Sequence, residues 1–258
     1  MLFTYESYAA MLKSLNRKGY DFKNYNSWQE TGRSVILRHD VDNSLEKAAI
    51  LSEVEKSVFP EGVQATYFVL VSTNFYNIHS QDSKKQMRQI IRNGGIIGLH
   101  FDETQYTISD EREMQKYVRE EADILSAVVG EKINVVSMHR PSRNFLSSDM
   151  EFPGIINSYS ETYFKNMKYL SDSRRHWREN ADEIIEDSLY PRLHILTHPF
   201  WYMQDREKPL KETLQSAVLQ ASLHYYDNLN NNFRELDTEL KRSEIERIIY
   251  KASDWEDT

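Results

Sequence analysis

The sequence predicts an α/β protein built around a mainly parallel sheet. Short apolar runs typical of strands alternate along the chain with longer segments whose apolar residues recur at helical spacing. Polar and ionisable residues follow directly after several of these runs, where parallel sheets and barrels place their functional side chains. The length of 258 residues is sufficient for one large domain of this class.

The strands are predicted from short segments that are rich in β-branched and aromatic residues. We expect them at 34–39, 64–72, 96–100, 132–138 and 193–197. A further strand is predicted around 163–170, within the region 145–172, where the pattern is weakest.

The helices are predicted from apolar stripes and from capping residues at their ends. We expect them over 43–58, 83–93 and 110–129, and again from residue 209 onward. Asn43 and Glu46 have the spacing of a capping box, and so have Asp110 and Glu113. Gly130 is the expected stop of the helix that Asp110 begins.

These elements predict one domain with three parts. They are an N-terminal helical extension over 1–32, a barrel over 34–202 and C-terminal helices over 207–258. No internal repeat or low-complexity segment indicates a second domain.

Composition argues against several classes of function. Forty acidic against 32 basic residues give a net charge of −8, and no clustered basic segment indicates a nucleic-acid partner. Cysteine is absent, so any bound metal must use histidine and carboxylate ligands. The apolar runs are far shorter than the roughly 18–20 residues of a membrane span. The first residues also lack the apolar core of a signal peptide, and we therefore expect a cytoplasmic protein.

Four polar clusters follow predicted strands. They are Arg38 to Asp42, Gly98 to Glu103, Ser137 to Pro141 and Leu196 to Trp201. Since side chains alternate along a strand, Asp40 and Asp42 should share one face and His39 should take the other. Two carboxylates on one face repel each other unless a cation or a shared proton lies between them.

Each cluster also has a purely structural explanation. The acids can cap the next helix, His100 can be a hydrogen-bonded structural residue, and His139 with Arg140 fits a surface turn. Taken together, however, the clusters place two Asp, three His and one Arg at the same end of successive strands. Carboxylates and imidazoles are ligands of zinc and other divalent cations, and a catalytic zinc site uses about three of them. A further carboxylate and histidine can then act as base and acid, which predicts metal-assisted hydrolysis of an acyl bond.

The order of these motifs resembles the polysaccharide deacetylase superfamily, which comprises carbohydrate esterase family 4 and the NodB-homology domains. The similar segments are HDVD at 39–42, QATYFVL at 64–70, NGGIIGLH at 93–100, MHRP at 138–141, SDSRRHW at 171–177 and LTHPFWY at 196–202. The resemblance implies a distorted (β/α)7 barrel with additional C-terminal helices.

The resemblance also implies roles for the polar residues. Asp40 corresponds to the general base, and Asp42 and His100 correspond to metal ligands. Arg140 matches the arginine that orients the base, and His198 matches the acid that protonates the leaving amine. The implied cofactor is a divalent metal, Zn²⁺ first and Ni²⁺ or Co²⁺ as alternatives.

Further residues are implied at the substrate groove. Asp172 and Trp177 match the motif that lines it, and Phe200 and Trp201 would form a platform for a sugar face or pack as core and rim. The implied substrate is an N-acylated sugar. Without a signal peptide, we expect a small, lipid-linked or nucleotide-linked precursor of capsule or O-antigen.

One departure from the family pattern affects the metal site. The family supplies a second imidazole four residues after the first, and that position is Thr104 here. His139 is the expected replacement, and Glu103 is the second choice. The same departure supports an alternative hypothesis, a catalytically silent carbohydrate-binding or accessory relative, because metal affinity depends on ligand number. A third hypothesis is an acyl-transfer accessory enzyme on the same barrel.

Overall fold

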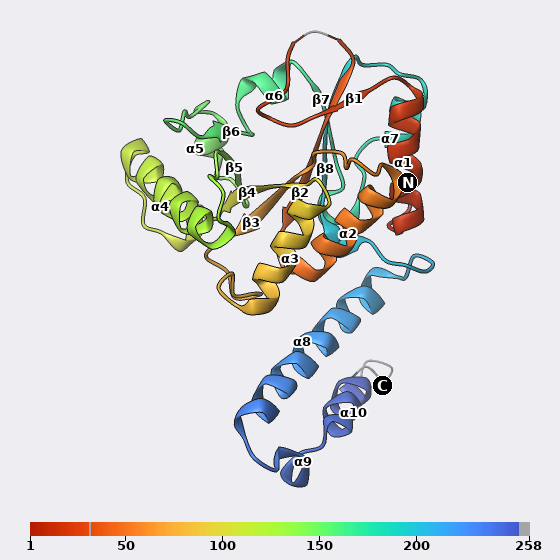
Figure 1. The fold of residues 1–258 in the computed structure, drawn as a ribbon, viewed down its shortest axis with the longest axis vertical. Helices are drawn as coiled ribbons and strands as arrows, with labels where there is room; N and C mark the ends of the chain where they lie inside the picture. The colour runs from red at the N-terminus through yellow and green to blue at the C-terminus, as the bar shows by residue number, and fades with distance from the viewer. Residues whose placement is uncertain (31, 253–258) are drawn as a thin grey trace. The chain divides into compact units, whose positions relative to one another are not determined.

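The computed structural model describes residues 1–30 and 32–252. It contains two compact units, Met1–Asp205 and Arg206–Thr258 (Figure 1). The larger unit has the predicted α/β fold and contains every predicted site residue.

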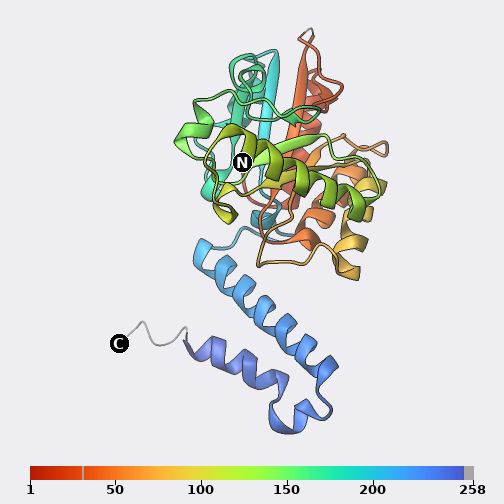
Figure 2. The ribbon, with the colours of Figure 1, turned by 90° about the vertical axis from the view of Figure 1, so that its left-hand side faces the viewer.

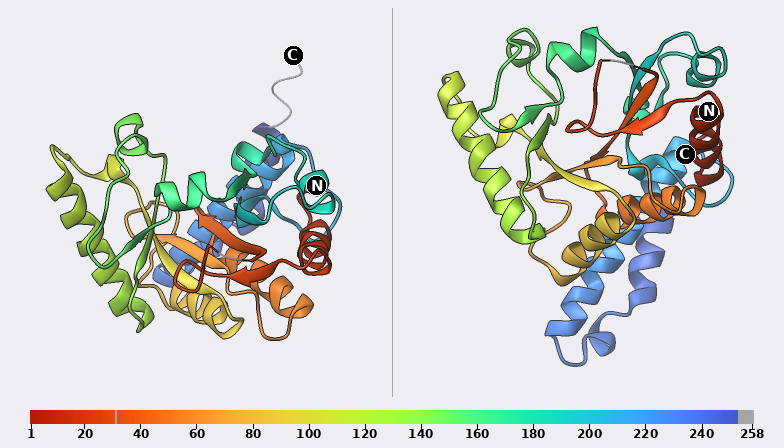
Figure 3. Two further views of the ribbon diagram at one scale, coloured as in Figure 1. Left: turned by 90° about the horizontal axis from the view of Figure 1, so that it is seen from above. Right: turned by 45° about the horizontal axis from the view of Figure 1, so that its top comes forward.

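A curled sheet forms the centre of the larger unit, and all its strand pairings in the described residues are parallel (Figure 3). Its strands are β1 (Asp21–Lys23), β2 (Ser34–Val41), β3 (Thr66–Leu70), β4 (Ile96–Phe101), β5 (Val135–Met138), β6 (Ile156–Asn157), β7 (Lys168–Ser171) and β8 (Arg192–Thr197). Their order is β6-β5-β4-β3-β2-β8-β7, and β1 pairs with the first residues of β2. Since β6 and β7 are not paired with each other, the sheet is an open half-barrel, consistent with a distorted (β/α)7 barrel.

Five predicted strands are confirmed as β2, β3, β4, β5 and β8. The strand predicted around 163–170 is wrong in its first half, because Glu161–Lys165 forms the short helix α6 and β7 begins only at Lys168. The aromatic residues that suggested a strand instead fill the interior of the half-barrel, where Tyr163 packs against Tyr25. Strands β1 and β6 were not predicted, since three and two residues give no readable periodicity.

Helices cover the outer face of the sheet. They are α1 (Tyr5–Arg17), α2 (Leu45–Val58), α3 (Gln81–Arg92), α4 (Glu111–Val129), α5 (Arg143–Leu146) and α7 (Ala181–Glu186), with 3-10 turns η1 (Glu103–Gln105), η2 (Ser173–Arg175) and η3 (Pro199–Trp201). Asp110 and Gly130 cap α4 as predicted. The capping box predicted at Asn43 is wrong, because Ser44 is the N-cap and its hydroxyl accepts the Lys47 N–H.

The two faces of the sheet are buried by different partners. The outer face packs against the helices in the larger apolar core, which includes Leu37 and Tyr67. The inner face encloses a smaller cluster around Ile36 and Phe68. Both faces of β2 are therefore buried along its whole length, as its position near the middle of the sheet requires.

The smaller unit is helical. It consists of α8 (Leu210–Asn232), α9 (Leu236–Glu239) and α10 (Arg242–Ala252) (Figure 2). The Tyr226 hydroxyl joins α8 to the end of α9 by donating to the Leu240 carbonyl at 2.7 Å. The C-terminal helices were predicted over 207–258, and residues 253–258 lie outside the described residues. Among the described helices, none combines the length and the apolar character that a membrane crossing needs.

Gly98 of β4 is required by the packing of the inner face. A Cβ atom at this position would lie 2.7 Å from two ring carbons of Phe68, on the neighbouring strand. We expect Gly98→Ala to lower the free energy of unfolding by about 1–3 kcal/mol, as overpacking in a core does. Urea unfolding measures this cost in two backgrounds. We expect Gly98→Ala to cost less in Phe68→Leu than in the wild type, because the smaller side chain leaves room for the new Cβ atom. Equal losses in both backgrounds would contradict the clash.

Candidate active site

Strand β2 directs its ionisable side chains to opposite faces. Asp40 and Asp42 lie on the inner face, where both face His100 of β4. His39 lies on the outer face, where it contacts Glu55 of α2. The predicted alternation is therefore confirmed, and the carboxyl end of β2 carries two acids on the same side.

Three donor atoms on this side form a nearly equilateral triangle. Nε2 of His100 lies 3.2 Å from Oδ1 of Asp42 and 3.2 Å from Nδ1 of His139, and the third edge, from His139 to Asp42, is 3.3 Å. Ligands about 2.0–2.1 Å from a tetrahedral zinc ion lie about 3.3 Å apart. The triangle thus has the size that three ligands of one metal ion would have.

The tautomer of His100 fits this role. Its Nδ1 lies 3.3 Å from the carbonyl oxygen of Ser137, which can only accept a hydrogen bond. A proton on Nδ1 leaves the lone pair of Nε2 directed at the triangle, and such an outer hydrogen bond commonly orients a metal-binding histidine. His100 is 1% exposed, whereas Asp42 is 31% exposed, so the triangle is open to solvent on the Asp42 side.

Asp42 supplies an ionised carboxylate to the triangle. Burial opposes ionisation of Asp42, but its close contacts with the imidazole rings of His100 and His139 outweigh burial and hold the pKa of Asp42 well below its usual range. Asp42 is therefore a carboxylate at neutral pH, which is the form that binds metal.

His198 approaches from β8 and is fixed by Asp172. Its Nδ1 donates to Oδ1 of Asp172 at 2.6 Å, and its backbone N–H donates to the other oxygen. Its Nε2 faces Asp42 at 3.9 Å. Burial alone would lower the pKa of His198, but the charge of Asp172 outweighs it and raises the pKa to about 9. His198 is thus a protonated acid next to the triangle.

The prediction that Arg140 orients Asp40 is wrong. Arg140 contacts Asp102 at 2.9 Å, and its side chain is 66% exposed. Arg38 occupies the position next to Asp40 instead, with Nε and Nη2 each 2.8 Å from one carboxylate oxygen. Burial raises the pKa of Asp40, but the charge of Arg38 outweighs it, and the result is a lowered pKa. The sequence analysis gave Arg38 no role at Asp40, because the segment that resembles the family motif begins one residue after Arg38.

Thr104 has a structural role at the position of the missing imidazole. Its hydroxyl donates to Oδ1 of Asp102 at 2.7 Å, in the turn that follows β4. Glu103, the second choice for the third ligand, is turned away and accepts hydrogen bonds from Ser142. His139 is therefore the candidate that the structure brings into the triangle.

The predicted groove residues differ in their placement. Asp172 is fully buried beneath His198, while Trp177 and Trp201 pack in part against the larger core. Phe200 is half-buried and meets Trp201 edge-on, with ring centroids 4.8 Å apart. Packing at the rim thus accounts for Trp201, and the sugar platform stays a prediction.

A second polar cluster lies behind the site, on the outer face, and was not predicted. Glu55 is 1% exposed and accepts hydrogen bonds from the hydroxyls of Tyr8 at 2.7 Å and Tyr67 at 2.8 Å. It also contacts Nε2 of His39 at 2.8 Å, and Nδ1 of His39 lies 2.6 Å from the Thr197 hydroxyl. The sequence signal that could have found Glu55 is its spacing, because it lies four residues after Leu51 on the face of α2 that is buried.

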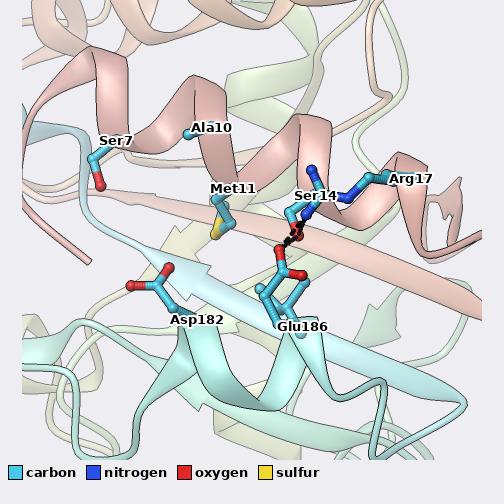
Figure 4. Close-up of a pocket in the computed structure, with 8 residues that line it drawn as sticks. Ser7, Ala10, Met11, Ser14, Arg17, Asp182 and Glu186 are labelled. Atoms are coloured by element: carbon cyan, nitrogen blue, oxygen red, sulfur yellow. Dashed lines mark hydrogen bonds and ion pairs between the residues drawn. The ribbon is translucent and has the colours of Figure 1, made fainter.

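A separate hollow lies between α1 and α7 (Figure 4). It has a volume of about 290 Å³ and lies against Ser14, Arg17, Asp182 and Glu186. These polar groups are already engaged, since Glu186 contacts Arg17 and Asp182 contacts the terminal amine of Met1. The hollow contains none of the triangle residues and offers no chemistry for catalysis.

Comparison with known proteins gave no match to a family model and no match to a curated sequence. Among solved structures, the chain is similar to a CE4 family pseudoenzyme from Bacillus anthracis, with 13% identity over 75% of this chain and a TM-score of 0.43. The chain spans 62% of the length of that protein.

Two other similar structures are named as deacetylases. PplD from Streptococcus pyogenes, solved with acetate, has 12% identity over 77% of this chain and 84% of its own, with a TM-score of 0.40. Peptidoglycan deacetylase PdaC from Bacillus subtilis has 14% identity over 80% of this chain and 100% of its own, with a TM-score of 0.35. At this level of similarity, conclusions about activity depend on this chain's own side chains.

Metal binding should depend on the three triangle residues. We expect Asp42→Asn, His100→Ala and His139→Ala each to weaken metal binding by more than the roughly 10–100-fold that loss of an outer-sphere partner causes. Elemental mass spectrometry of protein purified without chelators measures this. His79→Ala, which removes an exposed histidine elsewhere, is the matched control. Full metal content in His139→Ala would remove that residue from the ligand set.

The His198–Asp172 pair should make stability depend on pH. A pKa raised from 6.5 to about 9 means that the pair stabilises the fold fully below pH 6.5 and loses this contribution as pH rises through 9. We therefore expect the wild-type urea midpoint to fall between pH 6.5 and about 9, and to change less in Asp172→Asn. Ring-proton NMR should show a lower pKa of His198 in that variant. An unchanged pKa would contradict the assigned ion pair.

Proposed function

We propose that this protein is a metal-dependent hydrolase that removes the acyl group from an N-acylated sugar or glycan precursor. The observation that carries the proposal is the triangle of Asp42, His100 and His139, flanked by the carboxylate of Asp40 and the protonated ring of His198. One set of side chains thus combines three metal donors, a base and an acid.

The donor set fits a zinc-like divalent cation. Two imidazole nitrogens and one carboxylate oxygen are ligands that zinc, nickel and cobalt share, and three protein ligands leave one position open. When bound there, such a cation would polarise the acyl carbonyl and acidify the attacking water.

The residues around the triangle divide the proton transfers between them. Asp40 is ionised and takes a proton from the attacking water, while the new carbon–oxygen bond forms at the acyl carbon. His198 is protonated and gives the proton on Nε2 to the amine nitrogen as the carbon–nitrogen bond breaks. Asp172 holds the ring through Nδ1, so that Nε2 faces the reacting groups throughout. The products are a carboxylic acid and a free amino sugar.

For the substrate, we propose a small, lipid-linked or nucleotide-linked sugar precursor of capsule or O-antigen type. The half-buried ring of Phe200 follows the acid His198 by two residues and is available to contact a sugar face. This assignment is supported by the motif order and by the position of the aromatic residues beside His198.

Asp40→Asn should separate catalysis from metal binding. We expect turnover to fall by about 10²–10⁴-fold, the range for loss of a general base, while metal content stays at the wild-type level. The assay is release of carboxylate and free amine from a panel of N-acylated sugars, after loading with zinc or cobalt. Asp42→Asn is the contrasting variant, since it should lose both metal and turnover.

The same assay decides the alternative. A wild-type protein that binds metal and sugar but releases no amine would be a catalytically silent carbohydrate-binding relative, which the threonine at position 104 had suggested. Transfer of the acyl group to another acceptor, with no free acid formed, would instead indicate the acyl-transfer enzyme.

A further inference from the structure

We propose that Arg38, on the same strand as the base and two residues before it, is the positioning residue for Asp40. The inference rests on the proposed hydrolase function and assigns a role to a residue outside the motifs that carry the family resemblance. It replaces the role that the resemblance gave to Arg140.

The contact between the two side chains fixes the carboxylate in two directions. Nε of Arg38 donates to Oδ1 of Asp40 and Nη2 donates to Oδ2, both at 2.8 Å. A bidentate pair of this kind fixes the plane of the carboxylate as well as its position. Oδ2 then lies 3.7 Å from Nε2 of His100, with a further lone pair free to accept a proton at the triangle.

Arg38 is itself held from three sides of the half-barrel. It is fully buried, and besides Asp40 its Nη2 lies within hydrogen-bond distance of the Ser137 hydroxyl on β5 and 3.2 Å from the Tyr159 hydroxyl beyond β6. The guanidinium carbon lies 4.6 Å from the centre of the Tyr159 ring and 5.4 Å from that of Phe68. A guanidinium that is enclosed in this way has few alternative rotamers. It therefore also restrains the Asp40 carboxylate to which it is bound.

Arg140 cannot serve this purpose in the observed arrangement. Its guanidinium is engaged with Asp102, and its backbone has the left-handed φ of 52°, which directs the chain after His139 away from a regular strand. Asp102 also accepts hydrogen bonds from Thr104 and Gln105, so this pair belongs to the turn after β4.

Charge burial supports a functional reason for Arg38. A buried ion pair seldom stabilises a fold more than apolar residues of the same size would, because both ions must leave water. The inner face of β2 could therefore be apolar at position 38, as it is at Ile36, if packing alone mattered. A guanidinium at this position holds the neighbouring carboxylate in the orientation that faces the triangle.

The kinetic comparison uses three variants of the full chain loaded with metal, and Arg38→Ala and Asp40→Asn are used in addition for a rescue measurement. Arg38→Lys keeps the charge and removes the fork, Ser137→Ala loosens the guanidinium without removing it, and Arg140→Met tests the competing assignment. We expect Arg38→Lys to lower kcat by about 100-fold or more with KM changed less than about threefold, since the interaction acts on the base. Ser137→Ala should show a smaller loss of kcat, and Arg140→Met should leave kcat within about threefold.

Two measurements separate positioning from a general loss of structure. Metal content should stay at the wild-type level in all three variants, because the triangle is intact. Added guanidinium ion should restore part of kcat in Arg38→Ala and not in Asp40→Asn, which a merely structural role would not produce. Wild-type kcat in Arg38→Lys, or a large loss confined to Arg140→Met, would overturn the inference.

A crystal structure of Arg38→Lys distinguishes failure of this inference from failure of the proposed function. We expect the Asp40 carboxylate to rotate from its wild-type plane. If the wild type proves inactive on every acylated sugar but the carboxylate rotates in the variant, positioning stands and the hydrolase assignment fails. An unmoved carboxylate together with unchanged kcat would contradict positioning alone.

Discussion

The burial of charge on a central strand is the constraint on which the rest of the structure depends. Strand β2 carries Arg38, His39 and Asp40 in succession, and all three are at most 5% exposed. A buried charge without a partner costs several kcal/mol, and a buried polar group without a hydrogen bond is also costly, so each side chain needs a partner across the sheet or in the helix layer. The partners lie on both faces of the strand. Their contacts fix β2 relative to β5 on the inner face and to α2 and β8 on the outer face.

The two faces of β2 are coupled through this requirement. On the inner face the ion pair of Arg38 and Asp40 reaches Ser137 of β5, and on the outer face His39 reaches Thr197 at the end of β8. Thr197 immediately precedes His198, so the strand of the proposed base, Asp40, and the strand that leads to the proposed acid, His198, are joined directly behind the site. The separation between Asp40 and His198 is consequently set by paired strands, and the proposed proton transfers need such a preorganised arrangement.

Much of this arrangement could be predicted from the sequence, and the limits have physical causes. The alternation along β2, the five main strands and the approach of Asp42, His100 and His139 follow from periodicity and from the shared carboxyl ends of parallel strands. The partner of Asp40 could not be predicted, because two arginines at strand ends satisfy the same pattern and only side-chain packing decides between them. The strand expected around Tyr163 failed for a related reason: aromatic residues suit a strand and the filling of an open half-barrel equally well.

The sheet register explains how His139, the proposed third ligand, reaches the triangle. His100 pairs with Ser137, and Phe101 with Met138, so that His139 continues β5 on the inner face two residues beyond Ser137. Its backbone N–H donates to the Phe101 carbonyl at 2.7 Å, which extends the β4–β5 ladder to the ligand itself. His139 is thus positioned by the backbone ladder and not by the turn after β4, in which the Thr104 hydroxyl donates to Asp102. A threonine at position 104 is therefore compatible with a set of three donor atoms at the triangle, since geometry and not motif spacing determines which side chains meet.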